Sequence, residues 1–173
     1  FVVALLFTKN KITDMDQPKL FIQMALNAWD MQFTRTGKFL DSQSDADLQK
    51  EIAPGKNSLH YLLGHLIAVN DGMIGLFGAG ERSYAHLDDA FVKNPDKSGL
   101  DMPDASTLRS DWEKSNAQLS ALFKQMTPED WFSRHTAMTD EDFVTTPTRN
   151  KLSVLLNRTG HVAYHLGQLV LAK

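Results

Sequence analysis

The chain has 173 residues, of which 42% are hydrophobic and 23% are charged, and its formal net charge at neutral pH is −3. This is the composition of one folded domain, and the absence of cysteine fits a reducing, cytoplasmic location while it excludes disulfides, thiolate metal ligands and a cysteine nucleophile. The Lys and Arg residues are scattered rather than clustered, so we expect no nucleic-acid partner.

Residues 1–17 form an N-terminal extension before the first predicted helix, and we expect a single domain over residues 1–173. Apolar side chains occupy residues 1–7, a run far too short to span a bilayer, so no membrane association is predicted. The end of a secretion signal would be preceded by a basic region, which this run lacks. We favour a segment that lies on the body of the protein or on a second subunit.

Four segments show the apolar spacing typical of helices, at residues 18–40, 57–77, 104–126 and from 151 to the end of the chain. The first begins near Pro18 and the third at Asp104, and both residue types are preferred at helix starts. The second segment is apolar around nearly its whole circumference, which indicates an inner helix. The predicted fold class is therefore all-α, a four-helix bundle with long inter-helix connections.

Three connections separate these predicted helices, at residues 41–54, 78–103 and 131–150. We expect a turn of helix within residues 46–52 of the first and a short hairpin within the third. The last two connections are longer than normal bundle loops. Connections of that length are usually functional or mark a long crossover between helices.

The residues most informative about chemistry are His161 and His165, which are four apart on the last predicted helix. Residues at this spacing project from one side of a helix, so both imidazoles can bind a single metal ion. Two ligands hold a metal weakly, and we expect a third from another helix. His65 lies mid-helix among apolar residues, where either a metal ligand or a hydrogen-bonded core histidine fits. The core role is the commoner of the two.

The other histidines carry less information. His60 lies in the first turn of its predicted helix, on a different face from His65, and is interpreted as a surface or capping residue. His86 and His135 fall in long connections, where spacing gives no argument.

Two further groups of residues lie on the last predicted helix. Polar residues beside the histidine face are expected to position a substrate or cofactor or to orient the imidazoles: Asn157, Arg158 and Gln168. A stripe of small residues predicts close packing against another helix: Gly160, Ala163 and Gly167.

These residues form an ordered pattern that resembles the DinB-like superfamily of metal-binding four-helix bundles. The pattern consists of Pro54-Gly55, then Ser58-Leu59-His60-Tyr61-Leu62-Leu63-Gly64-His65-Leu66, and at a distance His161-x-x-Tyr164-His165-x-Gly167-Gln168. The resemblance implies that His65, His161 and His165 are the ligands of one divalent metal ion, zinc or nickel, and replaces the core interpretation of His65. Leu166 departs from the pattern, because relatives often carry a basic residue there.

The resemblance also implies a homodimer and a class of function. The family includes bacillithiol- and mycothiol-dependent S-transferases, isomerases and a few hydrolases. We therefore expect a metal-dependent enzyme that transfers an external low-molecular-weight thiol to, or hydrolyses, an unidentified small-molecule substrate. The sequence contains no distinctive general base, so the alternative is a non-catalytic, metal-stabilised dimeric bundle or a stress-response binding module. A metal-free bundle with core histidines is the third possibility.

Overall fold

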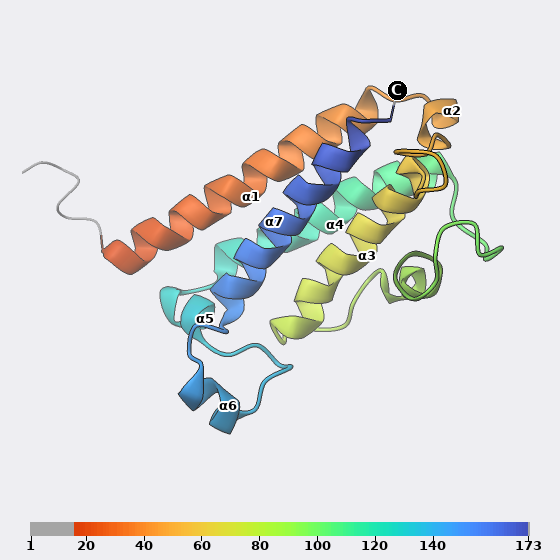
Figure 1. The fold of residues 1–173 in the computed structure, drawn as a ribbon. Helices are drawn as coiled ribbons and strands as arrows, with labels where there is room; N and C mark the ends of the chain where they lie inside the picture. The colour runs from red at the N-terminus through yellow and green to blue at the C-terminus, as the bar shows by residue number, and fades with distance from the viewer. Residues whose placement is uncertain (1–15, 173) are drawn as a thin grey trace, which may run out of the picture.

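The computed structural model describes residues 16–172, and all the regular elements among them are helical (Figure 1). The long helices are α1 (Gln17–Asp41), α3 (Leu59–Leu76), α4 (Ala105–Gln125) and α7 (Lys151–Leu169). The short elements are α2 (Asp45–Leu48), the 3₁₀ turn η2 (Ala85–Leu87), the π-helical η3 (Asp89–Lys93), α5 (Pro128–Phe132) and α6 (Asp140–Thr145). The all-α prediction is confirmed. The predicted role of residues 1–7 lies outside the described residues.

Local capping explains why the long helices begin where the sequence predicts. The side chains of Ser58, Asp104 and Asn150 each accept a hydrogen bond from the backbone N–H three residues further along. Helix α1 instead carries Pro18 in its first turn, where a missing N–H costs nothing. The last helix, α7, ends at Leu169 rather than at the end of the chain.

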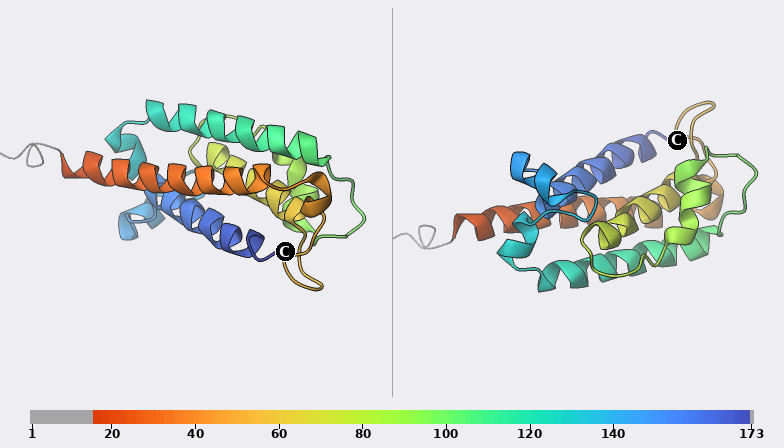
Figure 2. Two further views of the ribbon diagram at one scale, coloured as in Figure 1. Left: turned by 90° about the horizontal axis from the view of Figure 1, so that it is seen from above. Right: turned by 90° about the horizontal axis from the view of Figure 1, so that it is seen from below.

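The long helices pack as two neighbouring pairs, α1 with α7 and α3 with α4, and α3 also packs on α7 (Figure 2). Most residues of α3 are buried, which confirms the prediction of an inner helix. Aromatic residues fill the space between α1 and α4, where Phe33 stacks on Trp112 with 4.2 Å between ring centroids. No helix among residues 16–172 is both long enough and apolar enough to cross a membrane.

An ion-pair network holds the connection after α3 against that helix. Asp71 is buried and accepts hydrogen bonds from the backbone N–H groups of Ser83 and Tyr84 at 3.1 and 3.0 Å. The guanidinium of Arg82 donates to Asp71 and, at 2.6 and 2.7 Å, to both oxygens of Asp88. The same guanidinium lowers the pKa of the Asp88 carboxyl through its hydrogen bonds. The connection therefore returns to α3 instead of extending into solvent.

Element η3 packs on α3 at Gly64. The ring of Phe91 is fully buried there, and a Cβ atom added at Gly64 would lie 2.4 Å from it. Such a separation is far below van der Waals contact, so the position has room for glycine alone. The close approach places the backbone of Phe91 beside the next residue of α3, His65.

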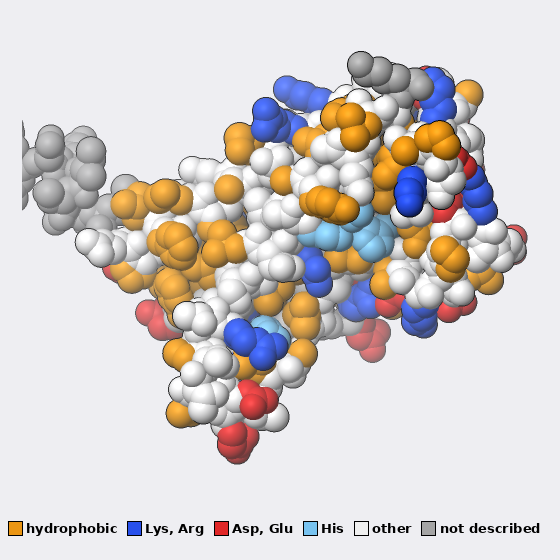
Figure 3. Space-filling model, viewed as in Figure 1, with side chains coloured by type: hydrophobic (Ala, Val, Ile, Leu, Met, Phe, Trp, Pro, Cys, Tyr) orange, Lys and Arg blue, Asp and Glu red, His pale blue; other side chains and the backbone are white. Residues whose placement is uncertain are grey.

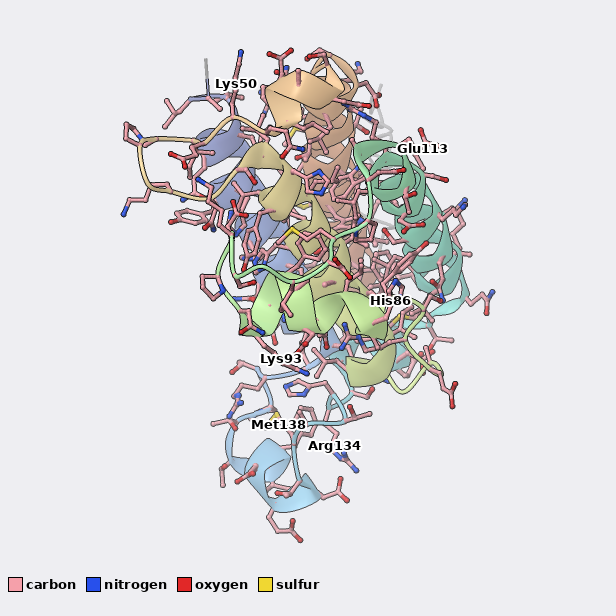
Figure 4. All side chains as sticks on the ribbon, turned by 90° about the vertical axis from the view of Figure 1, so that its right-hand side faces the viewer. Lys50, His86, Lys93, Glu113, Arg134 and Met138 are labelled. Atoms are coloured by element: carbon pink, nitrogen blue, oxygen red, sulfur yellow. The ribbon has the colours of Figure 1, made fainter. Side chains whose placement is uncertain are left out.

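The prediction of a hairpin before α7 is wrong. The connection contains α5 and α6, and its extended backbone forms one isolated bridge, between Arg134 and Asn150. The side chains of Thr127 and Thr139 cap the two short helices and so favour helix over strand. Figure 4 shows this lobe projecting from the end of the bundle, with Arg134 and Met138 at its base.

The stripe of small residues on α7 does not pack closely against another helix, contrary to the prediction. A Cβ atom added at Gly160 or at Gly167 would have no neighbour within 4 Å. Gly167 and Ala163 instead line a groove between α1 and α7. The small side chains therefore leave a surface depression and not a tight helix crossing.

His60 is buried, so its interpretation as a surface or capping residue is wrong. Its side chain lies under the connection that returns to α3, with 6.4 Å between its ring centroid and that of Phe91. The Nδ1 atom of His60 has no hydrogen-bond partner among the described residues. Burial lowers the pKa of this imidazole below its ordinary value.

Candidate metal centre

Three histidines from two helices converge on one point of the bundle. The Nε2 atom of His161 lies 3.0 Å from Nε2 of His165 and 3.3 Å from Nε2 of His65. All three candidate ligand atoms lie within 4.8 Å of one another. Figure 3 shows histidine surface in the middle of one face of the molecule, over α3 and α7. The structure thus brings together the three residues that the sequence singles out as metal ligands.

The spacing of these nitrogens fits a single divalent ion. Imidazole nitrogens bind zinc at about 2.0–2.1 Å, so two of them in a tetrahedral arrangement lie roughly 3.3 Å apart. The two Nε2–Nε2 separations from His161, 3.0 Å to His165 and 3.3 Å to His65, are close to this value. Three neutral imidazoles whose lone pairs face one another repel unless a cation or a proton lies between them. The cluster could therefore hold a metal ion.

Hydrogen bonds on the far side of two rings set their orientation. His65 donates from Nδ1 to the carbonyl oxygen of Phe91 at 2.8 Å, and His165 donates from Nδ1 to Oε1 of Gln168 at 2.7 Å. A proton on Nδ1 leaves the lone pair of Nε2 free, and both Nε2 atoms face the cluster. The amide of Gln168 also donates to the hydroxyl of Tyr164 at 3.0 Å, which holds Gln168 itself in place.

His161 differs from the other two histidines on its far side. Its Nδ1 atom is buried and has no hydrogen-bond partner among residues 16–172. Burial first, and then the nearby His165, His65 and Arg158, lower the pKa of His161 to about 4. The ring is therefore neutral at neutral pH, which is the state that a metal ligand requires.

Burial also lowers the pKa values of His65 and His165 below their ordinary value. Among the described residues, no carboxylate acts on the pKa of any of the three histidines, whereas the guanidinium of Arg158 lowers the pKa values of His65 and His161. Burial and the positive charge of Arg158 therefore both favour neutral imidazoles.

The three polar residues predicted beside the histidine face have different positions. Gln168 contacts His165 directly and orients it. Arg158 is half-buried near the cluster, and burial lowers its pKa. Asn157 is exposed, and its Oδ1 accepts a hydrogen bond from Nη1 of Arg158 at 3.5 Å. A cofactor-binding role for these residues stays a prediction.

Sequence reasoning missed the partners supplied by η3 and by the start of α3. The acceptor for His65 is a backbone carbonyl, which no residue type reveals. Tyr61 lies one turn before His65, with its ring nearly parallel at 6.3 Å between centroids. Its hydroxyl donates to the carbonyl of Asn94 at 2.7 Å. Gly64 was the available signal, because a glycine inside a helix often marks a close approach of another segment.

Comparison with known proteins identifies the family to which this chain belongs. The model of the DinB superfamily matches residues 28–169, which include all of α3, α4 and α7 and most of α1. No curated protein matches this sequence. The family match covers most of the chain, and its span contains the three histidines in the order and on the helices described above. The chain therefore belongs to the DinB superfamily.

Proposed function

We propose that this protein is a metal-dependent enzyme in which His65, His161 and His165 hold one divalent ion, zinc or nickel. The observation that carries the proposal is the convergence of three Nε2 atoms at 3.0 and 3.3 Å, with the far nitrogens of two rings already hydrogen-bonded. This arrangement prepares the rings for a ligand before any ligand binds.

The number of ligand residues favours catalysis over a purely structural metal. Structural zinc sites are closed by four protein ligands, whereas catalytic sites have three and leave a position for substrate or water. Among the described residues the cluster contains three histidines. A bound divalent ion would supply a positive charge that stabilises the deprotonated form of a thiol or of water.

Thiol transfer suits this site better than hydrolysis. In such a transfer, the sulfur of a low-molecular-weight thiol forms a bond to an electrophilic carbon, and the leaving group departs with the bonding electron pair. The thiol proton passes to solvent, so no general base from the protein is needed. Hydrolysis would gain from a carboxylate at the cluster, and among residues 16–172 the cluster consists of three histidines and contains no Asp or Glu. The thiol itself must be external, because the chain has no cysteine.

We further propose a homodimer. Three large apolar side chains on one side of α1 are about half exposed: Phe21, Met24 and Met31. Their spacing of three and seven residues places them on one strip of the helix, as an interface would require. The molar mass in solution, measured by light scattering for the wild-type chain and a Met24→Glu/Met31→Glu variant, tests this proposal. A monomeric wild-type chain would contradict it.

The experiment that tests the main proposal combines metal analysis with an assay of thiol transfer. The metal content of the wild-type protein is compared with that of a His161→Ala/His165→Ala variant. The control is His86→Ala, which removes an exposed histidine from the connection between α3 and α4. We expect about one equivalent of zinc or nickel in the wild type and the control, and none in the double variant.

The assay then presents bacillithiol, mycothiol or glutathione together with an activated electrophile. Metal-dependent consumption of the thiol, lost in the double variant, is the expected result. Metal binding without turnover, together with a lower melting temperature on metal removal, would favour the non-catalytic bundle. Absence of metal after incubation with zinc and with nickel would contradict both readings and leave a metal-free bundle with core histidines.

A further inference from the structure

A concave site lined by basic residues lies near the start of α7, the helix that carries His161 and His165. It has a volume of about 380 Å³ between the end of α3, the start of α7 and the lobe before α7. Its polar lining consists of His135, Arg149, Ser153, Asn157 and Arg158. Two guanidinium groups and an imidazole thus face one cavity. No acidic residue lines it.

The positive charge in this cavity is not balanced by the protein. Neither Arg149 nor Arg158 forms an ion pair with a carboxylate among residues 16–172, whereas Arg82, Arg109 and Arg134 each do. Arg158 is half-buried, whereas Arg149 is exposed. A half-buried guanidinium group without an anionic partner is costly, because it loses hydration without gaining a counter-charge. An anionic ligand would supply that counter-charge.

Unsatisfied nitrogen atoms mark the same cavity. The Nε of Arg158 and the Nδ1 of His135 are buried and have no hydrogen-bond partner among the described residues. The cationic Arg149 is close enough to His135 to lower the pKa of its imidazole, in addition to the larger effect of burial. The residues that line this cavity therefore carry several side-chain nitrogens, and most of these are donors, as an oxyanion requires.

The cavity and two of the clustered histidines lie along the same helix, α7. Ser153, Asn157 and His161 are each four residues apart, so they lie on one strip of the helix, with about 6 Å along the axis between successive members. Arg158 belongs to both places, because it lines the cavity and lowers the pKa values of His65 and His161. Figure 3 shows basic surface directly beside the central histidine patch and again beside a second, smaller one.

We propose that this cavity binds the anionic group, a carboxylate or a phosphate, of the small molecule that reacts at the histidine cluster, with Arg149 and Arg158 as its main contacts. The binding of the anion stands by itself, while its role in a reaction rests on the function proposed above. The strip along α7 sets the expected substrate: its anionic group lies roughly 6–12 Å from its reacting atom.

Calorimetric titration of the full chain tests the proposal with three probes: succinate for a carboxylate, inorganic phosphate for a phosphate, and succinamide as a neutral control. We expect succinate, phosphate or both to bind metal-free protein with one-to-one stoichiometry, and succinamide not to bind. Which of the two anions binds more tightly identifies the anionic group. Failure of both anions to bind at millimolar concentration would overturn the proposal.

Variants locate the binding. Arg149→Gln and Arg158→Gln are each expected to weaken anion binding by about tenfold or more, because hydrogen bonds to charged groups contribute at least that much. Arg158→Lys, which keeps the charge at a half-buried position, should retain more affinity than Arg158→Gln and so separates loss of contact from loss of fold. Arg35→Gln removes one positive charge from an exposed part of α1 and should leave binding unchanged. Equal affinity in Arg149→Gln and wild type would refute the proposal.

The His161→Ala/His165→Ala variant separates this inference from the proposed function. Anion binding that persists in this variant and depends on Arg149 supports the cavity, whether or not the protein binds metal. Anion binding that needs zinc and ignores Arg149 would mean that the anion binds the metal itself, which refutes the cavity and leaves the metal centre standing. If thiol transfer is found, Arg149→Gln should raise KM for 6-mercaptohexanoate and should leave KM for the neutral 6-mercaptohexanol unchanged. The sulfur and carboxylate of 6-mercaptohexanoate can lie as far apart as the strip along α7 requires.

Discussion

Two of the three histidine rings owe their orientation to one hydrogen bond each. His65 donates to a backbone carbonyl, that of Phe91, so no side-chain substitution at the acceptor can remove the bond. His165 donates to the side chain of Gln168, which a substitution can change while the bundle stays intact. Gln168 is half-buried and also bonded to Tyr164, so it is a positioning residue with little part in the core.

Gln168→Leu is expected to lower zinc affinity by about 10- to 100-fold, the usual cost of removing the partner of a metal-binding histidine. The physical reason is that the ring of His165 loses its fixed tautomer and orientation. Gln168→Glu keeps an acceptor at the same place and should retain wild-type affinity or exceed it. Competition against a chelator of known zinc affinity measures the zinc affinity of the wild type and of both variants. Equal affinities for Gln168→Leu and the wild type would show that the hydrogen bond does not orient the ring.

At the scale of whole elements, the contact between α3 and η3 positions one residue of the histidine cluster, His65. The ring of Phe91 fills the space that a side chain at position 64 would need, and the carbonyl of the same residue accepts the hydrogen bond from His65. The Arg82 network with Asp71 and Asp88 holds the same connection from its other end. Displacing η3 therefore changes the core and the cluster together.

Gly64→Ala is expected to destabilise the protein by about 1–3 kcal/mol, the usual cost of overpacking a filled site, and also to weaken zinc binding. Gly72→Ala is the matched control on the same helix, because a Cβ atom there would have no neighbour within 4 Å. That change should stabilise the protein by about 0.5–1 kcal/mol through the higher helix propensity of alanine. Urea denaturation of both variants measures whether each substitution lowers or raises the free energy of unfolding. A Gly64→Ala variant as stable as Gly72→Ala would contradict the packing argument.

For the whole molecule, several buried neutral histidines make stability depend on pH. Burial lowers the pKa values of five imidazoles below the ordinary 6.5: His60, His65, His135, His161 and His165. The unfolded chain therefore takes up protons near pH 6.5, while the folded chain takes them up at lower pH, near 4 for His161. In this window the unfolded state binds more protons, so stability falls as pH falls.

The metal-free protein should accordingly lose unfolding free energy between about pH 7 and pH 4, and little of this effect should appear above pH 7.5. His60→Gln removes one of the five groups without touching the cluster, so the slope of stability against pH should be shallower in this variant. The slope is the readout, because the absolute stability of the variant also reflects lost packing. Chemical denaturation at a series of pH values measures it, and identical slopes would contradict the buried neutral state of His60.

Metal binding should stabilise the whole bundle, because the ligands come from α3 and α7 and are brought together by folding. At a free zinc concentration about 100 times the dissociation constant, the gain is about 2.7 kcal/mol. For a chain of this size, that corresponds to a rise in melting temperature of roughly 5–10 °C. Calorimetry with zinc and with a chelator measures the difference. A His161→Ala/His165→Ala variant with the same rise would place the metal elsewhere.

The sequence by itself determined the helices and the identity of the three histidines. Helix starts depend on residues within three or four positions, such as Ser58 with Tyr61, so capping and apolar spacing were enough to predict them. His161 and His165 were likewise identified as possible metal ligands from their spacing of four residues on one helix. His65 could not be chosen over a core role by spacing, and the resemblance to the DinB-like superfamily was needed to select it.

The tertiary structure alone decided what surrounds those histidines. The burial of His60, the carbonyl of Phe91 behind His65 and the cavity shared by His135, Arg149 and Arg158 all depend on where the long connections return to the bundle. The predictions of a hairpin before α7 and of close packing at Gly160 and Gly167 were wrong for the same reason. A local pattern shows which conformation a segment prefers, but the path of a long connection is set by contacts with residues far away in the chain, such as Asp71 with Arg82 and Gly64 with Phe91.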